Sequence, residues 1–115
     1  MATPSEMSAA TPLAPLGLVG YQEGAVVSRT LLKRAGGTIT LFAFDEGQSL
    51  SEHTAPFDAL VMIIEGESEI SVAGTRHRVS AGQLLRLPAR QPHALKAVTP
   101  FKMILIMIRA PGAVS

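Results

Sequence analysis

Two histidines, His53 and His93, are the residues whose chemistry stands out in this sequence. A neutral imidazole can ligate a metal, accept a proton or donate one hydrogen bond. Burial in an apolar wall would keep both rings neutral, because burial disfavours the charged form. The third histidine, His77, lies between Arg76 and Arg78, and we expect it to be exposed to solvent and to take no part in a site.

The sequence offers these imidazoles few partners. It contains no cysteine, which excludes disulfides, thiolate chemistry and zinc sites built on cysteine. Glu52 adjoins His53, and Asp58 follows five residues later. In a regular strand both carboxylates would face the side opposite to the pocket, and only a bulge would turn either one inward.

Composition limits the classes of function. The chain has 115 residues, of which 47% are hydrophobic and 17% charged, which is enough for one compact domain with a core. A net charge of +1 gives no reason to expect a nucleic acid or a membrane as partner. No Lys or Arg precedes Arg29, and the longest apolar runs have six residues, too few to span a bilayer. We therefore expect a cytoplasmic protein.

Two regions of the sequence differ in composition and in apolar pattern. Residues 1–18 are rich in Ala, Pro, Ser and Thr and show no period, which predicts a flexible N-terminal tail. Over residues 19–110, short apolar runs alternate with Gly and Pro breaks about every 8–12 residues, which predicts an all-β sandwich or barrel in one domain. The expected strands are Val26–Arg34, Thr38–Phe44, Leu50–His53, Ala59–Ile64, Glu67–Val72, Arg76–Val79, Gln83–Leu87, His93–Val98 and Phe101–Ile108.

Glycine and proline mark the expected turns. The segment 64–67 reads as a tight hairpin in which Gly66 takes a positive φ. Residues 72–75 read as a second hairpin. Pro88 and Pro92 cannot donate to a sheet ladder, so the chain between them is expected to be a loop.

Two stretches resemble the two motifs of the cupin superfamily. The first motif reads G, five residues, H-x-H, three or four residues, E, then about six residues and G, and residues 47–67 resemble it. The second motif reads G, five residues, P-x-G-x-x-H, and residues 82–93 resemble it. The matching residues are Gly47, His53, Gly66, Gly82, Pro88 and His93.

The resemblance implies a single-domain cupin β-barrel of the small RmlC-like type, also called a double-stranded β-helix or jelly roll. Such proteins hold ligands and metals inside one open end of the barrel and are often dimers. They include dioxygenases, isomerases, epimerases, storage proteins and sensor domains, so the fold alone does not choose the function. We also expect a homodimer because an open sheet edge needs cover.

The sequence departs from the family pattern at the site. The family's second histidine falls on Ala55, its metal-binding glutamate on Ala59, and the glycine of the second motif on Arg90. Of the usual metal ligands only His53 and His93 remain. Two imidazoles alone make a weak, open site. If a cofactor binds there, the resemblance implies a divalent transition metal: Zn, Ni, Fe, Mn or Cu.

Strand alternation gives a separate expectation for the lining of the pocket. Side chains two residues apart share a face, so Ser51 and Ala55 should accompany His53, and Ala59 and Val61 should share that side on the next strand. The predicted pocket residues are His53, His93, Ala55, Ala59, Ser51 and Val61. A pocket with these small side chains leaves room for a ligand or for water.

Three functions stay open at this level. The first is a domain that binds a small molecule against His53 and His93, as a sensor, carrier or regulatory module. The alternative is a metal-dependent enzyme, of dioxygenase or isomerase type, with the two histidines as ligands. The third is a metal-free enzyme that uses a neutral histidine as general base, although no carboxylate is evident to orient either ring. The sequence names no substrate.

Overall fold

The computed structural model of the protein describes residues 6–110, and within that range it contains one short 3-10 helix (η1) and nine β-strands. No helix in the described part of the chain is long and apolar enough to cross a membrane. The all-β class predicted from the sequence is confirmed. The elements are η1 Pro15–Gly17, β1 Val26–Arg34, β2 Gly37–Phe44, β3 Ser49–His53, β4 Phe57–Glu65, β5 Glu67–Val72, β6 Thr75–Ser80, β7 Leu84–Leu87, β8 His93–Ala97 and β9 Phe101–Arg109.

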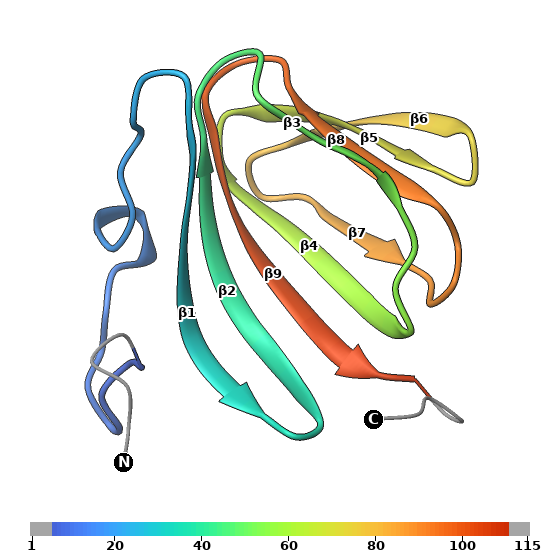
Figure 1. Cartoon of the computed structure of the whole chain (residues 1–115). Helices are drawn as coiled ribbons and strands as arrows, with labels where there is room; N and C mark the ends of the chain where they lie inside the picture. The colour runs from blue at the N-terminus through green and yellow to red at the C-terminus, as the bar shows by residue number, and fades with distance from the viewer. Residues whose placement is uncertain (1–5, 111–115) are drawn as a thin grey trace.

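The strands form two antiparallel sheets that enclose the core between them (Figure 1). The first sheet has the order β1-β2-β9-β4-β7, and we call it sheet A. The second has the order β3-β8-β5-β6, and we call it sheet B. The last strand, β9, lies in the middle of sheet A, where it pairs with β2 on one side and β4 on the other.

The core follows from the alternation of side chains along each strand. On β4, Ala59, Val61 and Ile63 are buried, whereas Met62 between them is exposed. Both sheets contribute, and the rings of Phe44 and Phe101 stack inside with centroids 4.5 Å apart. The apolar period of two that predicted the strands is therefore also the reason why the sheets close on each other.

The turns agree with the sequence at two places and differ at one. The chain at Ala73 and Gly74 turns with positive φ at both residues and joins the paired strands β5 and β6, which confirms the second hairpin. The chain from Pro88 to Pro92 is a loop, as expected. The hairpin predicted at Gly66 is wrong, because β4 belongs to sheet A and β5 to sheet B. Gly66 takes the expected positive φ of 77°, but it bends the chain from one sheet into the other.

The chain before β1 runs alongside that strand (Figure 1). The Met7 amide donates to the Leu31 carbonyl at 2.9 Å, and the Lys102 ammonium of β9 donates to the Leu16 carbonyl at 2.8 Å. Lys102 is only 9% exposed and also lies over the Tyr21 ring. Residues 1–5 of the predicted tail lie outside the described residues, and the mobility of the tail stays a prediction.

Candidate ligand pocket

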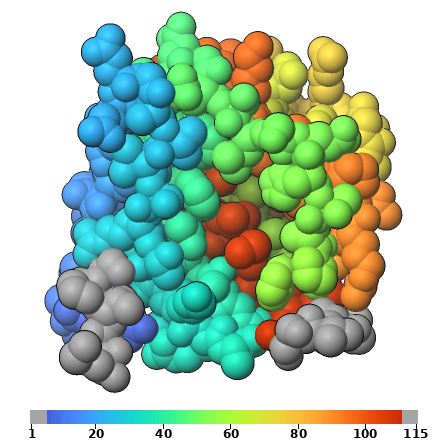
Figure 2. Space-filling view, viewed as in Figure 1, coloured from blue at the N-terminus to red at the C-terminus, as the bar shows by residue number. Residues whose placement is uncertain are grey.

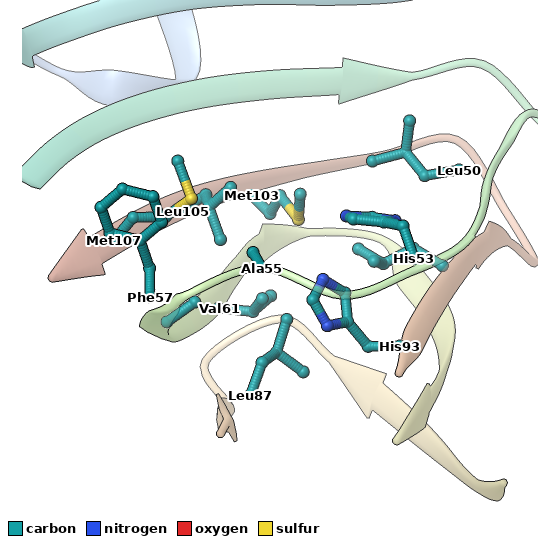
Figure 3. A pocket seen from close by; sticks show the side chains of 12 residues that line it. Leu50, His53, Ala55, Phe57, Val61, Leu87, His93, Met103, Leu105 and Met107 are labelled. Carbon is teal, nitrogen blue, oxygen red and sulfur yellow. The ribbon is translucent and has the colours of Figure 1, made fainter. Parts of the chain in front are cut away.

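A cavity lies between the two sheets and contains both histidines (Figure 3). About 60 Å³ of it is open to the centres of water molecules, which is room for a few of them at roughly 10–15 Å³ each. In the space-filling view, atoms of β9 form the floor of a hollow between β2 and the chain around β3 (Figure 2). The residues that line the cavity are Leu50, His53, Ala55, Phe57, Ala59, Val61, Leu87, His93, Leu95, Met103, Leu105 and Met107.

The two imidazoles are in direct contact. His53 ends β3 and His93 begins β8, and the register of these antiparallel strands places the two residues opposite each other. The ring centroids lie 4.3 Å apart and the ring planes meet at 67°. His93 is only 8% exposed, whereas His53 is on the open side of the cavity. Residues about forty positions apart in the sequence thus form one pair.

Backbone carbonyls fix the tautomer of both rings. Nδ1 of His53 lies 2.8 Å from the Ser51 carbonyl oxygen, and Nδ1 of His93 lies 3.2 Å from the Gln91 carbonyl oxygen. A carbonyl oxygen only accepts, so Nδ1 carries the hydrogen and donates in each ring. In a neutral imidazole the other nitrogen, Nε2, is then an acceptor. These orienting groups could not be predicted from the sequence, because they belong to the main chain.

His93 is held in its neutral form. Burial lowers the pKa of His93 below its ordinary value of 6.5, and the charge that His53 can carry lowers it further. The hydrogen bond to the Gln91 carbonyl opposes this shift without reversing it. Near neutral pH the cavity therefore contains an imidazole rather than an imidazolium at this position.

Five of the six predicted pocket residues line the cavity, and one does not. His53, His93, Ala55, Ala59 and Val61 are among the lining residues. Ser51 is exposed, and it borders a polar hollow on the outer face of sheet B. The reason is a register shift in β3 between Leu50 and His53, which breaks the alternation and turns Leu50 inward in place of Ser51.

The other lining residues were not among the six predicted for the pocket. Phe57 and Leu87 are not at motif positions. An apolar side chain of this kind gives the same sequence pattern whether it fills a core or lines a cavity. Met103 and Met107 share one face of β9, and the alternation of that strand was the only signal for their role. His77 is half-buried, not exposed as expected, and it lies opposite Ile70 rather than at the cavity.

The carboxylates near the histidines are used elsewhere. Asp58 pairs with Ile108 on the face of β4 opposite to Ala59, so the bulge that would turn it inward does not occur. Its Oδ1 accepts from the Ala89 amide at 3.1 Å and from Arg86 at 3.3 Å, and these contacts, the backbone one first, lower its pKa. Glu52 is exposed. Among residues 6–110, no three or more His, Asp or Glu side chains are grouped so as to hold a metal ion.

Comparison with known proteins identifies the family. A conserved protein of unknown function from Streptococcus pyogenes is 35% identical over 97% of this chain and 98% of its own, with a TM-score of 0.88. A cupin superfamily protein from Desulfitobacterium hafniense is 28% identical over 95% of this chain and 100% of its own, with a TM-score of 0.86. A Cupin 2 conserved barrel domain protein from Leptotrichia buccalis is 39% identical over 81% of this chain and 45% of its own, with a TM-score of 0.79.

No curated protein matches the chain. The model of the Cupin 2 family, described as a cupin domain, matches residues 40–109, which include β3, β8 and the cavity between the sheets. The resemblance read from the two motifs is thereby confirmed, and the chain belongs to the Cupin 2 family of cupin domains.

Proposed function

We propose that this cupin domain binds a small molecule in the cavity between its sheets, with the ligand in contact with His53 and His93. The observation that carries the proposal is the lining of the cavity: ten apolar side chains and two imidazoles in mutual contact. Ligand sites are commonly apolar hollows with a few polar groups that orient the ligand. This site has that composition, and a role as sensor, carrier or regulatory module would need no further chemistry.

The lost family ligands support binding over catalysis. Ala55 and Ala59 place methyl groups in the cavity where the family pattern has a histidine and a glutamate. A methyl group neither holds a metal nor transfers a proton, but it leaves space next to the imidazoles. The result is a site with room and orientation for a ligand and with few reactive groups.

The test is a screen of small apolar compounds by thermal shift and by NMR, followed by a variant that fills the cavity. Ala55→Met should abolish the binding of any compound found, because the longer side chain enters the cavity. Ala81→Met, at an exposed turn, is the control and should leave binding unchanged. Compounds that bind equally to both variants, or a full complement of metal in the protein as purified, would overturn the proposal.

A metal-dependent enzyme is the second candidate, and the contact between the two rings favours it. Within residues 6–110 the backbone contacts of the two rings are made by Nδ1 and not by Nε2, and both rings line one cavity. The residues present do not fit a closed metal site, however, because such sites have three or four protein ligands and this cavity offers two neutral nitrogens. Elemental analysis of the purified protein tests this candidate, which requires a stoichiometric metal that is lost in His93→Phe; a protein without metal would exclude it.

A further inference from the structure

The polar side chains of the cavity can accept hydrogen bonds but have no unused hydrogen to donate. Each imidazole uses its Nδ1 hydrogen on a backbone carbonyl, which leaves an Nε2 lone pair as its free polar atom. The ten other lining residues are Ala, Val, Leu, Met and Phe, whose side chains donate no hydrogen bonds. A ligand that satisfies the site must therefore bring its own donor.

The two imidazoles are the ionisable groups of the described lining. The ten other lining side chains are neither acidic nor basic, and His93 is buried among apolar neighbours. Asp58 and Arg86 pair with each other on the outer face of sheet A. A carboxylate, a phosphate or an alkylammonium ion would lose its hydration in this cavity without gaining an opposite charge, which is costly. The ligand is accordingly uncharged.

The space available sets the size of the part that enters. About 60 Å³ open to water centres accommodates a few non-hydrogen atoms, and the walls are apolar except at the histidine pair. Met103 and Met107, whose side chains adapt their shape, line the same wall (Figure 3). A short alkyl group is the natural occupant of this part of the cavity.

We infer that the ligand class of this pocket is an uncharged, mainly apolar compound with a hydroxyl group, an alcohol or a phenol, whose O–H donates to an imidazole Nε2. The inference rests on the proposed function and deepens it. The hydroxyl supplies the donor that the site lacks, and the alkyl or aryl part occupies the apolar wall. Carboxylates and phosphates, which need a cationic partner, are excluded from this class.

The decisive experiment compares two isomers, butan-1-ol and diethyl ether. They have the same atoms and differ in that the alcohol donates a hydrogen bond, whereas the ether only accepts. Protein labelled with ¹³C at the methionine methyl groups is titrated with each at pH 8, where ordinary histidines are neutral. The methyl signals of Met103 and Met107 report on the cavity, and that of Met62, on the outer face, is the internal control. Butanoate and butylammonium complete the series.

The expected result is that butan-1-ol binds about 3- to 10-fold more tightly than diethyl ether, the factor that one net hydrogen bond supplies. Butanoate and butylammonium should bind more weakly than the alcohol. Equal affinity of the alcohol and the ether, or tighter binding of either ion, would overturn the ligand class while leaving the pocket as a binding site. If none of the four compounds shifts the cavity methionines, the proposed function itself fails.

Histidine variants locate the acceptor. In His53→Phe or His93→Phe a planar aromatic ring is kept and the Nε2 acceptor is removed, so at least one of them should bring the alcohol-to-ether ratio close to one. His77→Phe is the matched control, because His77 lies outside the cavity, and it should keep the wild-type ratio. A ratio that survives in both pocket variants would contradict the assignment of the hydroxyl to the histidine pair. Circular dichroism of each variant establishes that it is folded.

Discussion

At the scale of single residues, Gly66 is the position with the least freedom. A Cβ there would lie 2.1 Å from the Pro100 carbonyl oxygen and 2.9 Å from the Phe101 Cα, and φ is +77°. Gly66→Ala should therefore lower the free energy of unfolding by about 3 kcal/mol or more, because a main-chain clash adds to the left-handed conformation. Gly74 has a similar φ of +85°, but in the described residues no atom beyond its chain neighbours lies within 4 Å of a Cβ built there. Gly74→Ala should therefore lower the free energy of unfolding by only about 1–2 kcal/mol. Urea denaturation measures both, and equal losses would contradict the role given to the clash.

His93 should make the fold less stable in acid. Its pKa is below 6.5 in the folded protein, chiefly through burial, and near 6.5 in the unfolded chain. At pH values between the folded and the unfolded pKa of His93, the unfolded chain binds a proton that the folded protein does not. The stability of the fold therefore decreases as the pH falls below about 6.5, and this destabilisation is absent at higher pH. The urea midpoint of His93→Phe should consequently fall less between pH 7.5 and pH 5.5 than that of the wild type. An identical fall in both proteins would show that another group is responsible.

Much of the candidate site could be predicted at this scale, and the exceptions have identifiable causes. The motif spacing was enough to select His53 and His93, and Ala59 and Val61 followed from alternation. Ser51 could not be placed, because the bulge that turns it outward depends on how β3 pairs with β8. Arg90 occupies the motif's glycine position at a φ of +65°, which explains why a glycine suits this loop and leaves the arginine without a structural explanation.

At the scale of elements, strand positions were accessible from the sequence and strand partners were not. Each strand is a local pattern, since the period of two and the flanking Gly or Pro lie within about ten residues. The connection at Gly66 shows the limit. A glycine between two apolar strands looks alike whether the strands pair or the chain crosses to the other sheet, and only contacts between distant segments decide which occurs.

The segment before β1 gives a prediction at the element scale. A chain that begins at Leu18 lacks the Leu16 carbonyl, which leaves the nearly buried Lys102 ammonium with Glu65 at 3.8 Å and the Tyr21 ring. We expect a loss of about 1.5–3 kcal/mol of unfolding free energy, the usual contribution of a hydrogen bond to a charged group.

The control for this truncation is the same shortening in a Lys102→Met background. There the loss should be smaller, because no ammonium needs the carbonyl. A shortened wild-type chain of unchanged stability would instead support the tail as an independent, mobile segment.

At the scale of the whole molecule, the homodimer expected from the sequence stays a prediction, and the outer face of sheet A is the surface that would carry it. Leu84 is 58% exposed and Ile108 55%, and Met62 lies beside Leu84 on the same face. An exposed apolar patch of this kind favours association. We expect light scattering to give twice the mass of the chain, and Leu84→Lys combined with Ile108→Lys to give a monomer. Ser49→Lys, on sheet B, should leave the mass unchanged.

The central position of β9 has a consequence for synthesis on the ribosome. Sheet B has all of its strands once Ala97 has left the ribosome. Sheet A lacks its central strand, β9, until Phe101–Arg109 follows. Until then a nascent chain presents the bare edges of β2 and β4, and unpaired edges are prone to pair with other chains. A message cut short before the codons for Phe101–Arg109 should therefore yield an insoluble product rather than a slightly smaller barrel.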